Sequence, residues 1–156
     1  MPEPYGEEDG ILKKPVVGYG LHLTLDGYGC SQERLANLDA IYEFLDHCPD
    51  LIQMTKIMPP YVFKYQAPVP EDWGVSGFVL IAESHISIHT YPDRAYLSLD
   101  IFSCKEFDYH RAVAYITEFF SVARHELNLL DRGLEFPREV KTVERLLRQE
   151  RKQMRG

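Results

Sequence analysis

Apolar and polar residues alternate in several short stretches of the chain, and this period of two predicts β-strands. The first expected strand covers residues 16–26, where leucines at 21, 23 and 25 alternate with His22 and Thr24. Prolines at 59 and 60 should interrupt a second strand or confine it to a sheet edge, because proline cannot donate a backbone hydrogen bond. The later strands are expected over residues 52–65, 76–90, 95–103 and 122–130.

Two other stretches repeat their apolar residues at helical spacing. The first predicts a helix over residues 32–48, with Ser31 placed to cap it and Pro49 placed to end it. The second begins after Asp108, a suitable capping residue. The apolar faces of these helices would comprise Leu35, Leu38, Ile41, Tyr42 and Leu45, and then Ala112, Val113, Ile116, Phe119 and Phe120.

The order of these elements predicts an α+β fold. We expect a two-layer α/β sandwich in which a mostly antiparallel sheet carries both helices on one face. Because the strand residues look apolar on both sides, we expect a second copy to cover the other face, so that the chain dimerises through sheets or sheet edges. We divide the chain into a flexible leader (1–15), a folded domain (16–134) and a charged C-terminal helix (135–156).

Composition and charge fit one globular domain. The 156 residues suffice for one core, and 45% of them are apolar. No apolar run approaches the roughly 20 residues that span a bilayer, and the leader lacks signal-peptide features, so we expect a cytoplasmic protein without membrane contact. A net charge of −7 argues against a nucleic-acid partner. Three cysteines without a CxxC pair predict neither a disulfide framework nor a zinc site.

Reactive side chains gather in residues 77–104, inside strands that otherwise resemble plain core. His85 and His89 would share one strand face, but no further ligand is spaced to complete a zinc site with them. A serine hydrolase would need a GxSxG elbow, and AESHI is not one. A polar edge strand with hydrogen-bonded histidines stays open beside these alternatives. The reactive residues are Glu83, Ser84, His85, Ser87, His89 and Cys104.

The segment AESHISIHTYPD, followed by LDIFSC, resembles the bacterial and archaeal S-adenosylmethionine decarboxylases, a family of self-processing pyruvoyl enzymes. A histidine five residues after the serine, a cysteine twenty after it and a Ser-Gly pair eight before it fall in register. Weaker similarity runs over residues 18–133. The resemblance implies a zymogen in which the Ser84 hydroxyl attacks the Glu83 carbonyl. The chain would then split between these residues, and Ser84 would become a covalent pyruvoyl cofactor.

The same resemblance implies roles for the neighbouring residues. The substrate amine would form a Schiff base with the pyruvoyl carbonyl, which acts as an electron sink. His89 with Ser76 would assist cleavage, and Cys104 would return a proton to the substrate α-carbon. Because Ser84 and His89 are an odd number of residues apart in one predicted strand, we expect a bend or bulge near Ser84 that strains the peptide bond.

The similarity departs from the family where the substrate binds. The family's Trp-Pro-Glu, whose glutamate holds the ribose, is Tyr-Pro-Asp at residues 91–93, so Asp93 and Tyr91 are the expected substrate-binding residues. The leading hypothesis is an S-adenosylmethionine decarboxylase for polyamine (spermidine) biosynthesis, acting as a homodimer of cleaved protomers. The alternatives are decarboxylation of arginine or ornithine and an unprocessed, non-catalytic regulatory paralogue. The candidate aromatic platforms for adenine are Phe63, Tyr65 and Trp73.

Overall fold

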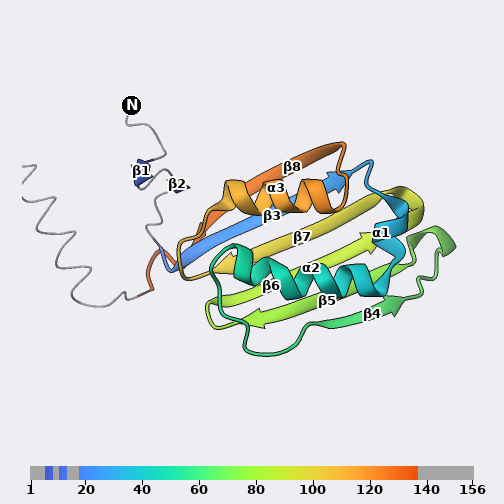
Figure 1. The fold of residues 1–156 in the computed structure, drawn as a ribbon, viewed down its shortest axis with the longest axis horizontal. Helices are drawn as coiled ribbons and strands as arrows, with labels where there is room; N and C mark the ends of the chain where they lie inside the picture. The colour runs from blue at the N-terminus through green and yellow to red at the C-terminus, as the bar shows by residue number, and fades with distance from the viewer. Residues whose placement is uncertain (1–5, 9–10, 14–17, 137–156) are drawn as a thin grey trace, which may run out of the picture.

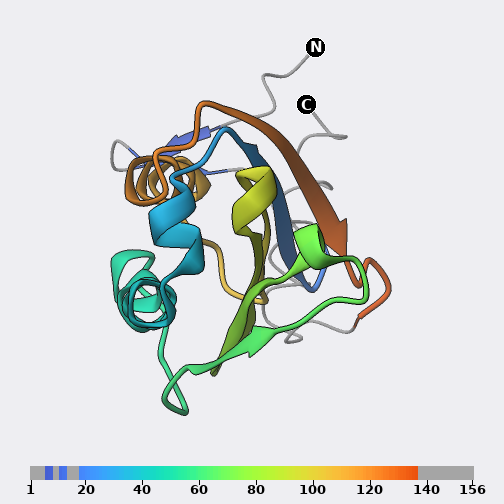
Figure 2. The ribbon, with the colours of Figure 1, turned by 90° about the vertical axis from the view of Figure 1, so that its right-hand side faces the viewer.

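The computed structural model describes residues 6–8, 11–13 and 18–136. Among these residues, six strands form one antiparallel sheet and three helices cover one of its faces (Figure 1). Figure 2 shows the helices and the sheet as two layers. The predicted α+β sandwich is confirmed. In order across the sheet, the strands are β4 (Tyr61–Tyr65), β5 (Gly74–Ile81), β6 (Ser84–Tyr91), β7 (Tyr96–Ser103), β3 (Gly20–Tyr28) and β8 (Arg124–Arg132).

The first predicted helix is two helices in the structure. These are α1 (Gln32–Ala36) and α2 (Leu38–Leu51), and they are separated at Asn37, whose backbone is extended. The Asn37 side chain accepts hydrogen bonds from the backbone N–H groups of Asp39 at 2.9 Å and Ala40 at 3.1 Å. The break therefore creates a capped N-terminus for α2.

Leu38 and Tyr42, which were expected on the apolar face of the first helix, are exposed in the structure. The capping signals are confirmed, whereas the expected helix end at Pro49 is wrong. This proline lies inside α2 and does not end it, because a proline in the last turn removes only one backbone donor from the helix. Ser31 caps α1 as predicted. Asp108 caps α3 (Tyr109–Phe119) by accepting a hydrogen bond from the Arg111 N–H at 3.1 Å.

The predicted strands differ from the observed ones in several places. Residues 52–60 are not a strand, and the predicted second strand is reduced to β4, which directly follows the two prolines and pairs with β5. The predicted strand over residues 76–90 is a hairpin in which β5 and β6 pair antiparallel, with Ala82 and Glu83 as its turn. The last strand, β8, continues through Asp131 and Arg132, beyond its predicted end at residue 130.

Alternate residues of the sheet face the helices and form the core, among them the three leucines of β3. The opposite face, which we call the open face, carries the other residues of each strand. These are not mainly apolar: His22, Asp26, His85 and Asp100 lie there beside Phe102. The prediction of an apolar second face is wrong for the central strands, because the alternation places several polar side chains there, whereas β4 carries exposed aromatic residues on the same face. Dimerisation stays a prediction.

Short strands also occur within the predicted leader, where β1 (Gly6–Glu8) and β2 (Ile11–Lys13) pair antiparallel. The other leader residues, and the predicted C-terminal helix apart from residues 135–136, lie outside the described part of the chain. Within the described part, no helix is both long and apolar enough to cross a membrane.

Candidate active site

The expected cleavage point lies at the β5–β6 turn. Glu83 is the second residue of this turn, and Ser84 begins β6 with a φ of 153°. Such a backbone conformation costs a residue with a Cβ on the order of 1–3 kcal/mol. The Glu83 carbonyl oxygen accepts a hydrogen bond from the Cys104 N–H at 2.9 Å. The peptide bond between Glu83 and Ser84 is therefore strained at the Ser84 backbone and polarised at the Glu83 carbonyl.

A loop segment holds the turn in place. The Ala82 N–H donates a hydrogen bond to the Thr55 carbonyl at 2.8 Å, and the Thr55 N–H donates to the Glu83 carboxylate at 3.2 Å. Next to Thr55, Lys56 forms an isolated bridge with Ile81. The segment predicted as part of a second strand thus acts as a clamp on the β5–β6 turn.

Cys104 lies beside the same turn because Ser84 and Ser103 are direct cross-strand partners. The buried Ser103 hydroxyl donates to the Lys105 carbonyl at 2.7 Å and accepts from the Lys105 N–H at 3.0 Å. These two hydrogen bonds form a tight turn with Cys104 at its centre, and the Cys104 side chain is exposed. The thiol is accessible next to the expected cleavage point.

Tyr19 also belongs to this site, although it was not predicted from the sequence. Its hydrogen bond with Cys104 raises the pKa of Tyr19, while a weaker effect from a hydrogen bond with Ser84 lowers it. The Tyr19 ring packs 6.0 Å from the Phe102 ring and 4.5 Å from the Phe136 ring, measured between centroids. The residues that meet at Tyr19 are far apart in the sequence, so no local motif marks it. We call Glu83, Ser84, Cys104 and Tyr19 the cleavage group.

Ser76 and His89 form a second group, the serine–histidine pair. They are cross-strand partners on β5 and β6, and the Ser76 hydroxyl oxygen lies 2.9 Å from His89 Nδ1. The pair lines a cavity of about 260 Å³. Aromatic rings and one carboxylate also line this cavity, from Phe63, Tyr65, Tyr91 and Asp72.

The structure does not bring His89 to Ser84 within one chain. Both lie on β6, and five residues of strand span roughly 16 Å. The bend expected near Ser84 is the hairpin turn at Ala82 and Glu83, directly before this residue. It does not bring His89 closer, because β6 pairs with β7 without interruption from Ser84 to Tyr91. The unusual backbone conformation lies at the same hairpin turn. The cleavage group and the serine–histidine pair are therefore at opposite ends of one strand.

Of the two expected substrate-binding residues, one lines the cavity and the other does not. Tyr91 lines the cavity, whereas Asp93 is exposed in the short 3₁₀ turn Pro92–Arg94 and is not among the lining residues. Asp72 was not predicted, and its carboxylate lies 2.6 Å from the Nε atom of Arg94. It comes from the loop before β5, whose path the sequence pattern does not define.

Among the three candidate aromatic platforms, two line the cavity. Phe63 and Tyr65 extend from β4, and Phe63 lies directly across from Ser76 in the sheet. Trp73 is not a lining residue, and its ring instead lies 4.8 Å from the Nζ atom of Lys64. The edge strand β4 thus supplies the aromatic surface of the cavity.

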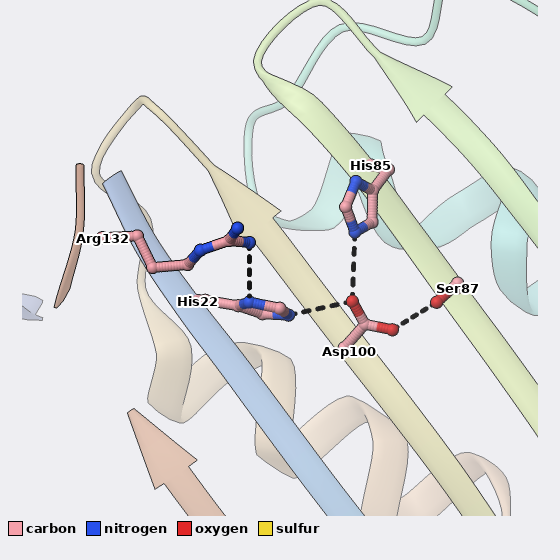
Figure 3. Close-up of polar contacts among 5 residues, drawn as sticks. All are labelled: His22, His85, Ser87, Asp100 and Arg132. Atoms are coloured by element: carbon pink, nitrogen blue, oxygen red, sulfur yellow. Dashed lines mark hydrogen bonds and ion pairs between the residues drawn. The ribbon is translucent and has the colours of Figure 1, made fainter. Parts of the chain in front are cut away.

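A polar cluster centred on Asp100 lies on the open face (Figure 3). Its Oδ2 atom is 2.9 Å from His22 Nε2 and 3.1 Å from His85 Nε2, and its Oδ1 atom accepts a hydrogen bond from Ser87. The Arg132 guanidinium lies 3.1 Å from His22 Nδ1. Burial alone would raise the pKa of Asp100, but the hydrogen bonds from Ser87, His22 and His85 outweigh it and hold that pKa below its ordinary value.

Within the described residues, His22, His85 and Asp100 are the one group whose ligand atoms lie close enough to hold a metal ion, all within 4.8 Å of one another. Each of these atoms already has a hydrogen-bond partner. Arg132 donates to His22 Nδ1, which assigns the ring proton to Nε2, facing Asp100. The arrangement is a hydrogen-bonded network in which His22 directs no lone pair at a shared ion position.

Comparison with known proteins agrees with this fold. A family profile described as S-adenosylmethionine decarboxylase matches residues 21–133. The chain belongs to this family, and the resemblance stated from the sequence is confirmed.

Individual relatives give the extent of the similarity. A Clostridium botulinum (strain Langeland) protein named S-adenosylmethionine decarboxylase proenzyme is 37% identical over 115 residues, which cover 73% of this chain and 94% of the relative. A Pyrococcus furiosus protein of the same name is 37% identical over 117 residues, covering 74% and 80%. The crystal structure of the adenosylmethionine decarboxylase from Aquifex aeolicus matches with a TM-score of 0.65 at 31% identity, covering 74% of this chain and 92% of that one.

Proposed function

We propose that this protein is a self-cleaving, pyruvoyl-dependent decarboxylase of S-adenosylmethionine that supplies the aminopropyl donor for polyamine biosynthesis. The observation that carries the proposal is the β5–β6 turn. There Ser84 has a positive φ, and the Glu83 carbonyl accepts a hydrogen bond from Cys104. The names of the relatives support S-adenosylmethionine as the substrate.

Cleavage begins when Ser84 Oγ attacks the Glu83 carbonyl carbon, so that an ester C–O bond replaces the peptide C–N bond. The Cys104 N–H, 2.9 Å from the Glu83 oxygen, stabilises the negative charge that develops on this oxygen. Removal of the Ser84 α-proton then expels the Glu83 carboxylate and leaves a dehydroalanine end. Water replaces its nitrogen, which leaves as ammonia, and a pyruvoyl group results.

The residues around Ser84 fit such a group. After cleavage its amide link to His85 stays in β6, which is paired with β7. The pyruvoyl ketone would accept the electron pair that departing CO₂ leaves behind. The exposed Cys104 thiol would donate a proton to the substrate α-carbon, and its effect on the pKa of Tyr19 indicates that this tyrosine lies beside the thiol.

The cavity beside the serine–histidine pair suits the nucleoside part of the substrate. The faces of Phe63 and Tyr65 offer stacking surfaces for adenine, and the Asp72 carboxylate can accept hydrogen bonds from ribose hydroxyls. At about 260 Å³ the cavity is slightly smaller than typical small-molecule sites, which begin at about 300 Å³. This size fits one part of a larger site.

We infer that two copies complete the site. Roughly 16 Å of strand separates the serine–histidine pair from the cleavage group in one chain. In a two-fold dimer the same patch of each copy faces its counterpart, so the Ser84 end of one protomer can meet the His89 end of the other. Exposed aromatic side chains on the open face, including Tyr61 and Phe63, supply apolar surface for this contact.

Two measurements test the function. Intact-mass spectrometry should find one fragment of residues 1–83 and a second of residues 84–156 that begins with a pyruvoyl group, and Ser84→Ala should give a single uncleaved chain. A wild-type chain that stays full-length would overturn the proposal. Assays of CO₂ release should detect product from S-adenosylmethionine and none from arginine or ornithine. CO₂ release from arginine or ornithine but not from S-adenosylmethionine would leave the proposed mechanism in place and contradict the proposed substrate.

A further inference from the structure

We propose that Asp100 is a positioning residue that fixes the beginning of β6, and thereby the group made from Ser84, once the chain has been cleaved. This inference rests on the proposed function. It concerns the consequence of cleavage for the strand itself: when the bond after Glu83 breaks, the first residue of β6 loses its covalent link to the turn. A free strand end frays unless further contacts hold it.

Side chains from the beginning of β6 converge on one carboxylate. His85 and Ser87 are the first and third residues after Ser84, and they bind the two different oxygens of Asp100. Figure 3 shows both side chains directed at this carboxylate from the same strand. Two anchors on alternate residues fix both the register and the rotation of the strand end.

The Asp100 carboxylate is also hydrogen-bonded from β3, on the side of β7 away from β6. His22 on β3 lies 2.9 Å from Asp100, and Arg132 on β8 lies 3.1 Å from His22. The Arg132 guanidinium also lies 4.3 Å from the centre of the Phe102 ring. The Asp100 cluster therefore connects β6 through β7 and β3 to β8, which are continuous strands that cleavage does not interrupt.

Asp100 does not touch the reacting atoms, so its effect must pass through His85. The pyruvoyl group and its amide neighbour are joined directly to this histidine. A displacement of about 1 Å at a reacting group can cost about a hundred-fold in rate. Loss of the anchor should therefore lower kcat and leave substrate affinity nearly unchanged, because none of the cavity residues Phe63, Tyr65 and Asp72 belongs to the Asp100 cluster.

Asp100→Asn in the full chain tests the proposal. We expect cleavage into both fragments, a kcat lower by about ten- to a hundred-fold, and a KM within about two-fold of wild type. Amide hydrogen exchange in residues 85–88 of the cleaved protein should become faster. The matched control is Asp26→Asn, because Asp26 is another open-face carboxylate and accepts a hydrogen bond from the Tyr96 hydroxyl at 2.7 Å. This control should keep the wild-type kcat and exchange rates.

His85→Ala provides a second variant, which removes only the hydrogen bond from His85 to Asp100. It tests the proposal if Asp100→Asn does not fold. It should shift kcat and exchange in the same direction by a smaller amount. Wild-type kcat and wild-type exchange at residues 85–88 in either folded variant would overturn the proposal. Failure of the proposed function is distinguishable, because the wild-type chain itself would then remain uncleaved by intact mass.

Discussion

At the level of single residues, Ser84 combines a nucleophilic hydroxyl with a backbone conformation that glycine adopts far more readily. We predict that Ser84→Gly is more stable than Ser84→Ala, although both remain uncleaved. Relief of the strain outweighs the larger chain entropy that glycine loses on folding, and the net difference should be about 1 kcal/mol in the free energy of unfolding. Urea denaturation of the two variants measures it.

Ser98 is the control for this comparison, because it lies inside β7 and is not among the residues with positive φ. There the order should reverse, with Ser98→Gly less stable than Ser98→Ala. Equal or lower stability of Ser84→Gly relative to Ser84→Ala would show that the backbone at the cleavage point is not strained.

The three cysteines should also differ sharply in reactivity. Burial raises the pKa of Cys30 to about 11 and that of Cys48 to about 12, whereas Cys104 is exposed. A thiolate forms only as pH rises toward its pKa, so at pH 8 fewer than about one in a thousand of the buried thiols is reactive. Iodoacetamide should add one group to the folded Ser84→Ala chain at Cys104, and three in urea. Labelling of Cys30 or Cys48 in the folded chain would contradict this prediction.

At the level of elements, period-two alternation and capping residues predict most of the fold. Ser31 and Asp108 cap helices where the sequence places them, and the leucines of β3 alternate into the core. The hairpin turn at Ala82 and Glu83 could not be predicted, because neither residue is typical of turns. Distant contacts with Thr55 and Cys104 hold that turn instead.

In the candidate site too, residues marked by the local sequence could be predicted, whereas residues brought together by distant contacts could not. Ser84, His89, Cys104 and Ser76 could be predicted because they belong to one continuous motif and its near neighbours. Tyr19, Asp72 and the Asp100 cluster could not, because each depends on which distant strands the sheet brings side by side. Their residue types alone are common on protein surfaces.

The break between α1 and α2 leads to a prediction at the same level. Asn37 satisfies two N–H groups at the beginning of α2, so Asn37→Ala should lower the free energy of unfolding by about 1 kcal/mol. Asn37→Asp should retain most of the stability, because aspartate is an equally good cap. Urea denaturation of both variants in the uncleaved Ser84→Ala background measures the effect. A neutral Asn37→Ala would indicate that packing alone determines where α2 begins.

At the level of the whole molecule, the open face is chemically divided. The Asp100 cluster lies on the central strands, beside the end that carries Ser84. The aromatic residues of β4 and the serine–histidine pair lie toward the other edge. In a two-fold dimer built through this face, the Ser84 end of one copy would meet the serine–histidine pair of the other. One substrate site could then contain residues from both copies.

Complementation between two inactive chains tests this arrangement. Ser84→Ala lacks the cleavage nucleophile and keeps the serine–histidine pair, whereas His89→Ala keeps the cleavage group. When the two variants are co-expressed, each mixed dimer would hold one intact site. Random pairing should then yield about one quarter of the wild-type number of sites, with a matching fraction of cleaved chains by intact mass.

The control is co-expression of Ser84→Ala with Cys104→Ala. In a mixed dimer, the site that contains Ser84 of the Cys104→Ala chain lacks the Cys104 thiol. The site that contains Cys104 of the Ser84→Ala chain lacks the pyruvoyl group, so neither site is intact. Activity should therefore stay near the level of Cys104→Ala alone, because Cys104 and Ser84 lie at the same end of the sheet in one chain. Recovery in this control, or its absence in the Ser84→Ala and His89→Ala pair, would mean that the serine–histidine pair and the cleavage group do not meet across two copies.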